Sequence, residues 1–362
     1  MKITFLGGYK SFDYRQIGGI DSLARRLGGE LVRMGHEVSF VHFGGPSEQS
    51  EITPEGVRLR YFIGFEEALE YLAENVQHVI TIYIPPRNRL AWISFRKSQD
   101  DRIKFHMYYS GWPESWIRRN MGYLDARLRL YNGTLFCASP RLENEVSRWA
   151  DRTALLLPPV SRGYFLDPDS KTENGSLRVT FMGRIDPKKG TDNVIDFFKY
   201  LAEKAPDIKT VISGYHWKQD PESVQLHREL LHQGSISYMP VEFDGHSPEV
   251  EEAARMLLRE TDILFLPYAR LSSTVDTPLL LLEGMAHLCV VVTRPLGSMP
   301  DVYGTSEYML DNLTDYELSL RLFKHIERRL PSERVRLASR CQKRDFEAGV
   351  AAKKLLSSIG EK

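Results

Sequence analysis

The chain contains 362 residues, of which 42% are hydrophobic and 27% are charged, and its 48 Lys and Arg residues balance its 48 Asp and Glu residues. This is the composition of a globular protein large enough for two domains, and zero net charge excludes the strongly basic chain of a typical nucleic-acid-binding protein. Three widely spaced cysteines predict neither a disulfide framework nor a metal site, and they indicate a reducing compartment. With no apolar run of the ~18 residues that a membrane span needs and no signal peptide, we expect a cytoplasmic protein.

Strand-like and helix-like patterns alternate along the first part of the chain. An apolar stripe from Ile20 to Met34 predicts the first helix, and Gly35 follows it as a residue suited to the left-handed conformation at a helix C-terminus. Strands are expected at residues 2–6, 37–43, 57–63, 78–84, 103–109, 134–138 and 153–157. Such alternation predicts a parallel sheet covered by helices on both faces.

A linker separates this part from a second α/β series. The pattern stops at Pro158 and Pro159, and residues 161–176 have the Pro, Asp, Gly, Ser and Asn content of a linker. Strands are then expected at 177–182, 209–213, 235–239, 262–266 and 288–293, with a helix at 192–202. The chain therefore reads as two doubly wound, Rossmann-like α/β domains, residues 1–165 and 166–340.

The last segment is charged and helical in pattern. Residues 331–359 predict a helix, and we assign residues 341–362 to a C-terminal helix. Such a helix can be solvated or can pack back on the first domain, and its sequence favours neither arrangement.

The most informative stretch is GRIDPKKG at residues 183–190, which follows a predicted strand and precedes a predicted helix. A strand-to-helix turn aims backbone N–H groups and cationic side chains, here Arg184 and Lys189, at one point where a phosphate can bind. Both could be ordinary surface charges, but their shared turn and the flanking glycines favour phosphate binding.

Glu283 lies in a second strand–turn–helix unit, within an otherwise apolar helix. A carboxylate there is a partly exposed helix residue or, as we favour, an acceptor of two hydrogen bonds from ribose hydroxyls. Thr277 is predicted to cap this helix and Pro278 to occupy its first position, which leaves the N–H groups of Leu279 and Leu280 directed at the same ligand. Two cations and a diol-binding carboxylate predict a nucleotide-diphosphate site. Ligands of doubly wound sheets bind beyond the carboxyl ends of the strands, so we expect this site in a cleft between the two domains.

Four groups of residues occur in a characteristic order. They are Gly18-Gly19 with Gly35-His36-Glu37-Val38; Pro158-Pro159-Val160 with Phe165; Gly183-Arg184 with Lys189-Gly190; and Glu283-Gly284-Met285-Ala286 with Val290-Val291-Val292, Gly297 and Pro300-Asp301-Val302. Over essentially the whole chain this order resembles glycosyltransferase family 4, whose members are retaining enzymes with the GT-B fold.

The resemblance implies roles for individual residues on the donor side. In that family an Arg and a Lys bind the diphosphate of the donor and the second Glu of an E-x7-E motif binds the ribose, which match Arg184, Lys189 and Glu283. Donor contacts are also implied for the residues Gly183, Gly214, Thr274, Asp276, Thr277, Leu279 and Leu280. The family needs no metal, so we expect no metal and no cofactor, only a nucleotide-diphosphate sugar as co-substrate.

The sugar half of the donor site departs from the family. Val275 stands where the family has its first Glu, which holds a hydroxyl of the sugar. Asp276 is adjacent and can replace that Glu with a shorter reach. Pro278 lacks the N–H that a family glycine supplies at this position.

The acceptor side is expected in the first domain. Gly18 and Gly19 resemble the family's glycine loop, although a tight turn without a ligand has the same sequence, and the preceding loop contains Tyr14 and Arg15. Family members often carry a catalytic His after a middle strand. Here Ser110 matches that position, and His106 could act from within the strand, although a mid-strand histidine is more often packed.

The stretch 87–148 is locally basic, with twelve Lys and Arg and six Asp and Glu residues, a net charge of twelve minus six, or plus six. Trp92, Trp112 and Trp116 lie in this stretch, and Trp149 follows it. This pattern fits peripheral contact of residues 87–149 with anionic lipid, a saccharide platform, or a solvated basic face over core tryptophans.

These observations predict a retaining, metal-independent hexosyltransferase or related glycosyltransferase. It would move a sugar from a nucleotide-diphosphate sugar to a hydroxyl of a glycan, a lipid-linked saccharide or a small glycoside, and would bind no nucleic acid. One alternative is a nucleotide-sugar epimerase of the same fold, which would need acid and base groups around the sugar. Another is a catalytically silent GT-B subunit that supports a partner enzyme.

Overall fold

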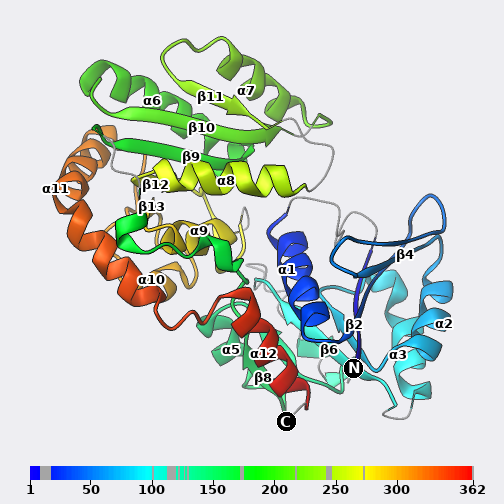
Figure 1. Ribbon diagram of the computed structural model, residues 1–362. Coiled ribbons are helices and arrows are strands. Elements are labelled where there is room, and N and C mark those ends of the chain that lie inside the picture. The colour runs from blue at the N-terminus through cyan, green and yellow to red at the C-terminus, as the bar shows by residue number, and fades with distance from the viewer. Residues whose placement is uncertain are drawn as a thin grey trace. The chain divides into compact units, whose positions relative to one another are not determined.

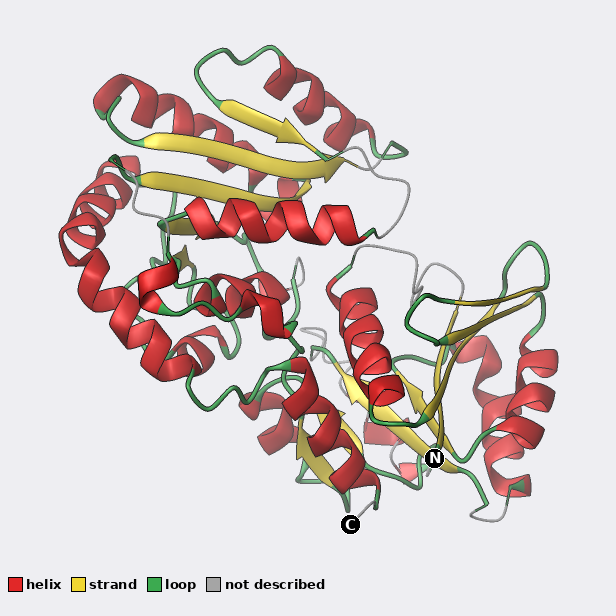
Figure 2. Cartoon of the chain, in the orientation of Figure 1, coloured by secondary structure: helices red, strands yellow, loops and turns green. Residues whose placement is uncertain are grey.

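The structure is a computed structural model that describes residues 1–8, 18–99, 102–111, 120, 123–125, 127–128, 130–171, 175–216, 218–241, 247–271 and 274–360 (Figure 1). The chain forms two compact units. The first comprises residues 1–162 and 345–362, and the second comprises residues 163–344. Each unit is an α/β structure with a sheet between helices (Figure 2).

The first unit is built on an eight-stranded sheet with the order β3-β4-β2-β1-β5-β6-β7-β8. Its strands are β1 (Lys2–Gly8), β2 (Glu37–Phe43), β3 (Gln49–Ile52), β4 (Arg58–Phe62), β5 (His78–Thr81), β6 (Lys104–Tyr109), β7 (Leu135–Cys137) and β8 (Thr153–Leu155). The seven predicted strands are present and pair in parallel. Strand β3 was not predicted; its four residues are all exposed, so they carry no apolar pattern, and it runs antiparallel to β4.

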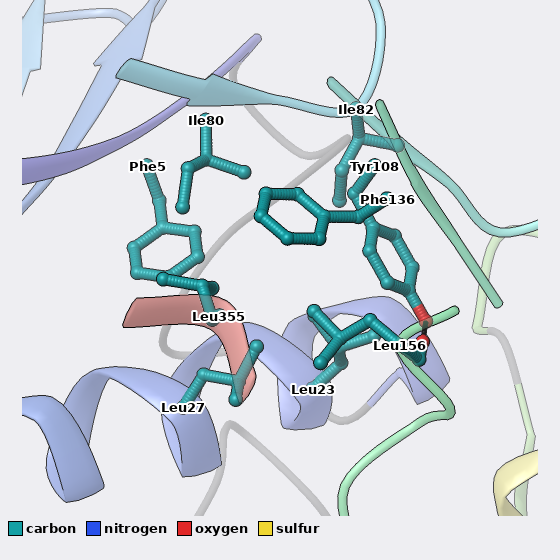
Figure 3. A pocket seen from close by; sticks show the side chains of 9 residues that line it. All are labelled: Phe5, Leu23, Leu27, Ile80, Ile82, Tyr108, Phe136, Leu156 and Leu355. Carbon is teal, nitrogen blue, oxygen red and sulfur yellow. Dashed lines mark hydrogen bonds between the residues drawn. The ribbon is translucent and has the colours of Figure 1, made fainter. Parts of the chain in front are cut away.

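Helices cover both faces of this sheet, as the alternating pattern predicts. Helices α1 (Gly19–Arg33), α5 (Pro140–Val146) and α12 (Ala348–Ile359) bury apolar residues on one face, and α2 (Phe65–Asn75) and α3 (Arg89–Ser98) bury them on the other. Figure 3 shows the first of these cores, where α1 and α12 meet the strands around a hollow that is too small for a water molecule. The side chains that line it are Phe5, Leu23, Leu27, Ile80, Ile82, Tyr108, Phe136, Leu156 and Leu355.

The second unit is built on a five-stranded parallel sheet with the order β11-β10-β9-β12-β13. Its strands are β9 (Arg178–Ile185), β10 (Lys209–His216), β11 (Ser237–Pro240), β12 (Ile263–Leu266) and β13 (Val290–Thr293). Its helices are α6 (Thr191–Lys204), α7 (Pro221–Leu231), α8 (Pro248–Glu260), α9 (Leu279–Ala286), α10 (Met299–Tyr303) and α11 (Tyr316–Cys341). The fold class predicted from the sequence, two doubly wound Rossmann-like units, is confirmed.

Neighbouring residues of β12 point to opposite faces of the sheet, and each packs against the helices on its own face. The ring of Phe265 lies with Phe197 of α6 and Phe323 of α11, with centroids 5.3–5.7 Å apart. Leu264 points the other way, and a Cβ on Gly284 of α9 would lie 2.7 Å from its Cδ2. Helices α6 and α9 therefore cover opposite faces, and glycine at position 284 lets α9 approach the sheet closely.

The end of the chain differs from the prediction of one helix over residues 331–359. Pro331 lies inside the 26-residue helix α11, and a second helix, α12, begins at Ala348. Proline is favoured at helix starts, which is why the sequence pattern placed a boundary there. Between the helices, Val160 N donates to Phe346 O at 2.7 Å and Ala348 N donates to Val160 O at 2.9 Å, and α12 packs against α1 of the first unit.

Candidate functional site

The sheet of the second unit changes its direction of winding between β9 and β12. Strand β10 lies on one side of β9, reached through α6, whereas β12 lies on the other side. In doubly wound sheets, ligands bind at this switch point, beyond the carboxyl ends of the strands. Residues 183–185 are the last residues of β9 and residues 186–190 follow it, and residues 267–283 follow β12. Most of the predicted donor-binding residues therefore lie at this one place.

Arg184 is oriented by a carboxylate that the sequence interpretation did not include. Arg184 lies in the last part of β9, which extends past the predicted end at residue 182, and its guanidinium forms an ion pair with Asp186. Asp186 is buried, its Oδ1 accepts a hydrogen bond from Lys188 N at 2.8 Å, and its own N–H donates to Thr191 Oγ1 at 3.0 Å. The Asp186 side chain is thus held by the turn itself, and it restricts the guanidinium to the end of the strand.

Glycines allow the backbone segments at this edge to come close together. Gly190 has φ +80°, and a Cβ there would collide with the carbonyl oxygen of Pro267, directly after β12. Gly214 of β10 pairs with Gly183 of β9, and a Cβ at Gly214 would collide with the Gly183 carbonyl oxygen. Any larger residue at either position would force the strand ends apart.

Lys189 projects from the same turn toward the segment after β12. Its Nζ lies 5.0 Å from the centre of the Tyr268 ring. Burial, and secondly the positive charge of Arg184, lowers the pKa of Lys189 to about 8, against the opposing effect of Asp186. An anion bound here would stabilise the protonated amine, because it would replace the lost hydration and offset the repulsion from Arg184.

Helix α9 contributes a buried carboxylate and its own N-terminus. Glu283 is only 7% exposed and lies one turn after Leu279, so both residues are on the same side of the helix. The pKa of the neighbouring Tyr268 hydroxyl is raised, first by burial and then by the charge of Glu283, and this hydroxyl is hydrogen-bonded to Thr274. The N–H groups of Leu279 and Leu280 have no carbonyl one turn earlier in the helix to bond to.

The side chain of Leu280 in α9 lies against the end of β9. A Cβ on Gly183 would lie 3.6 Å from Leu280 Cδ1. Together with the contact of Lys189 with Tyr268, this places the Arg184–Lys189 turn and the first turn of α9 around one point. The structure thus brings together the predicted phosphate-binding and ribose-binding residues.

The start of α9 differs from the prediction. The helix begins at Leu279, and Pro278, with an extended ψ of 138°, is its N-cap, so Thr277 does not cap it. Among the residues that the structure describes, none is a hydrogen-bond partner of the buried Thr277 Oγ1. Proline fits the first helical position, but its ψ is free, and here it remains extended.

Asp276, the predicted replacement for the missing Glu, is fully buried. A Cβ on Gly297 would lie 2.7 Å from its Oδ1, so this carboxylate packs against the backbone at Gly297. In this conformation Asp276 offers no surface to a sugar hydroxyl. The sequence shows the chemistry of this side chain but not its direction, which depends on a loop twenty-one residues later.

In the first unit, the predicted glycine loop precedes α1. Gly18 is the N-cap, and a Cβ there would collide with the Asp21 carboxylate, which lies over the helix N-terminus. A Cβ on Gly19 would meet no described atom within 4 Å. Tyr14 and Arg15 lie outside the described residues. A carboxylate at this N-terminus would oppose a negatively charged ligand there.

His106 has the environment of a packed histidine. It is 2% exposed; its Nδ1 accepts a hydrogen bond from Thr134 N at 2.9 Å, and its Nε2 lies 3.2 Å from His78 Nδ1. Burial, followed by the charge of His78, lowers the pKa of His106 to about 3, so the ring is neutral. Both ring nitrogens are engaged, and we keep only Ser110, which follows β6 and is partly exposed, as a candidate near the reacting sugar.

The tryptophans of the basic region differ from one another. Trp92 is fully buried and donates from Nε1 to Leu130 O at 3.0 Å, and Trp149 is partly buried with its ring edge-on to Tyr109. Trp112 and Trp116 lie outside the described residues. No helix in the described part of the chain is long and apolar enough to cross a membrane.

Comparisons with known proteins are consistent with this geometry. Residues 176–320, within the second unit, match the sequence profile of the family described as Glycosyl transferases group 1. None of the curated proteins is significantly similar in sequence.

Solved structures share the fold of the whole chain. The Anabaena Alr3699/HepE structure in complex with UDP and glucose has a TM-score of 0.68 at 13% identity, with 100% of both chains covered. A trehalose-6-phosphate structure from E. coli bound with UDP-2-fluoro glucose has a TM-score of 0.65 at 10% identity, with 99% of each chain covered. The catalytic domain of starch synthase IV from Arabidopsis thaliana bound to ADP and acarbose has a TM-score of 0.65 at 10% identity, covering 99% of this chain and 98% of that one. At such identities the likeness shows the fold alone.

Proposed function

We propose that this protein is a glycosyltransferase that transfers a sugar from a nucleotide-diphosphate sugar to a hydroxyl group. The observation that carries the proposal is the meeting of Arg184, Lys189, Glu283 and the first turn of α9 at the switch point of the second sheet. The match of residues 176–320 to group 1 glycosyltransferases supports the same reaction class.

The diphosphate is the part of the donor for which the site is best equipped. Arg184 can bind phosphate oxygens through two N–H groups, and its pairing with Asp186 sets the direction of that fork. Lys189 adds a second positive charge, and the α9 N-terminus adds backbone N–H groups. These groups would stabilise the charge that develops on the departing diphosphate. We therefore propose a transfer that needs no metal ion.

The nucleoside is proposed to bind through Glu283. Its carboxylate is buried beside Tyr268 and can accept hydrogen bonds from both ribose hydroxyls. The similar structures were solved with UDP or ADP, so uridine and adenosine diphosphates are the first ligands to test.

We propose that transfer proceeds with retention of the anomeric configuration. The acceptor hydroxyl attacks from the face that the diphosphate leaves, the bond from the anomeric carbon to the phosphate oxygen breaks, and that oxygen takes the acceptor proton. The acceptor role of the first unit, with Gly18, Gly19 and Ser110, rests on the family resemblance. A cytoplasmic location rests on the sequence pattern.

Two measurements test this function. Thermal shift with UDP, ADP and GDP measures binding, because a ligand of the folded state raises its melting temperature. Release of free nucleotide diphosphate from the corresponding glucose donors, with and without a chelator, measures turnover. Failure of every nucleotide diphosphate to stabilise the protein contradicts the proposal. Binding without turnover for any donor and acceptor identifies a catalytically silent subunit, and turnover that stops in chelator contradicts metal independence.

A further inference from the structure

Two segments of the first unit contact each other. The first runs from Tyr83 through the following turn and α3, and the second consists of residues 123–125, 127–128 and 130. The Arg89 guanidinium and Asp125 Oδ2 are 2.9 Å apart, and the Trp92 Nε1–H donates to Leu130 O at 3.0 Å, so an ion pair and a hydrogen bond hold the two segments together. In Figure 1, α3 lies at the outer side of this unit next to α2.

Large hydrophobic side chains are exposed in these segments. Leu90 is 82% exposed and Leu124 is 50% exposed. Thirteen large hydrophobic residues of the described part of the chain are exposed, and five of them lie here. The five are Tyr83, Leu90, Tyr123, Leu124 and Leu128. Scattered exposed apolar residues are normal, but such a concentration indicates an interaction surface.

The same segments are strongly basic. The described residues of these segments, 83–99, 123–125, 127–128 and 130, contain five Lys and Arg residues and one acid, Asp125, a net charge of five minus one, or plus four. Asp125 is buried in its pair with Arg89, so it leaves the exposed charge almost wholly positive. On α3 and its preceding turn, Arg87, Leu90, Ser94 and Lys97 are exposed at spacings of three or four residues, and they therefore share one side of the helix.

We propose that this surface docks the protein on an anionic lipid bilayer. The α3 surface, as we name it, consists of the exposed residues Tyr83, Arg87, Leu90, Lys97, Tyr123, Leu124, Arg127 and Leu128. A soluble polyanion would be recognised by the cations alone and would leave the leucines in water. A bilayer takes up both kinds of side chain, because leucine and tyrosine enter the interface while lysine and arginine contact lipid phosphates.

The aromatic and cationic side chains of the second segment fit the same partner. The Arg127 guanidinium carbon lies 5.2 Å from the centre of the Tyr123 ring. Arg127 itself stands between Leu124 and Leu128 in the sequence. Tyrosine is favoured at the level of lipid headgroups because one end of its ring is polar. Docking needs no sugar donor, so this inference does not depend on the proposed function.

The test is co-sedimentation of the full chain with phosphatidylcholine vesicles that contain or lack phosphatidylglycerol. We expect binding only to vesicles with phosphatidylglycerol. Arg87→Ala/Arg127→Ala should lower the partition coefficient about 30-fold, since each cation near an anionic surface contributes about a fivefold factor. Leu90→Ser/Leu124→Ser should lower it at least about tenfold.

A matched control comes from α7 of the second unit. Arg228 and Leu231 are both exposed there, so Arg228→Ala/Leu231→Ser makes the same kinds of change away from the α3 surface and should bind like the unaltered chain. Circular dichroism of each variant confirms that it is folded. Absence of binding to anionic vesicles, or equal losses in the α7 control, overturns the proposal. So does binding that depends on the arginines but not on the leucines, because soluble polyanions would then be the better partner.

Discussion

The two units contain the same kind of sheet but place their polar groups in different positions. In the second unit, Arg184, Lys189 and Glu283 lie beyond the carboxyl ends of β9 and β12, where a ligand can reach them. In the first unit, His106 lies within β6 and hydrogen-bonds the neighbouring chain segments. A polar residue at a strand end can serve a ligand, whereas one inside a strand must be satisfied by the protein, because no solvent reaches it.

The units also differ in what they expose. Eight of the thirteen exposed large hydrophobic residues of the described chain belong to the first unit, five of them on the α3 surface. The proposed donor site of the second unit is instead built from charged residues that are buried or half-buried. This contrast teaches that similar folds in one chain can specialise through the residues that follow their strands, and the following predictions test it.

The largest expected effect is a loss of sugar transfer when the cationic side chains of the proposed donor site are removed. Arg184→Ala or Lys189→Ala should each lower turnover about 10²-fold or more, by analogy with the loss of an oxyanion-stabilising donor. The matched control is Lys188→Ala, because Lys188 is exposed on the same turn and only its backbone N–H contacts Asp186. Steady-state release of nucleotide diphosphate is the measurement. Near-normal turnover in both site variants would remove the second unit as the donor site.

Acid should destabilise both units through one buried histidine in each. Burial lowers the pKa of His106 and of His287 to about 3, from the usual 6.5. Between pH 6.5 and 3 the unfolded chain binds protons that the folded chain does not, so stability falls as the pH falls and is unaffected above pH 6.5. At pH 5 each histidine should cost about 2 kcal/mol.

Urea unfolding at pH 7 and pH 5 measures this loss. His106→Gln and His287→Gln should each reduce the difference in the free energy of unfolding between pH 7 and pH 5, whatever their effect at pH 7. Two separate unfolding transitions would show which unit responds to each variant. If neither variant changes the loss of stability between pH 7 and pH 5, these histidines are not its cause.

Glu283→Gln should weaken the binding of the nucleotide diphosphate about tenfold while the fold is retained, because a neutral amide accepts weaker hydrogen bonds from the ribose hydroxyls. Titration calorimetry measures the affinity, and Glu222→Gln, an exposed change on α7, is the control. Comparing a nucleotide with its 2′-deoxy form sharpens the result. The variant should lose most of the difference in affinity between these two ligands. If it keeps that difference, Glu283 has a structural role and does not bind the ribose.

The smallest expected effect is a dependence of donor affinity on alkaline pH. The pKa of Lys189 is lowered to about 8, so above pH 8 this side chain of the free site progressively loses its positive charge, while Arg184 keeps its charge. Affinity for the nucleotide diphosphate should therefore fall about threefold or more from pH 7.5 to pH 9. Lys189→Arg should bind with little change over this range, because arginine stays protonated. Equal pH dependence in both proteins would show that another group titrates.

Local patterns in the sequence determined the α/β architecture and marked the turn that we propose to bind phosphate. Apolar runs predicted every strand except the fully exposed β3, because a strand that is buried on both faces must be apolar. Glycine spacing and charge marked residues 183–190, because a strand-to-helix turn with this chemistry has few other uses. These signals lie within a few residues of each other, and they need no knowledge of the rest of the chain.

Only the tertiary structure decided where single polar side chains point. Asp276 is buried against Gly297, Asp186 holds Arg184, and Trp92 belongs to the core and not to the basic surface. Each outcome depends on a contact with the backbone or side chain of another segment, and a residue's type does not reveal that partner. The burial of a polar group is a property of the packed chain, so the sequence identified the residue types of the proposed site but not their geometry.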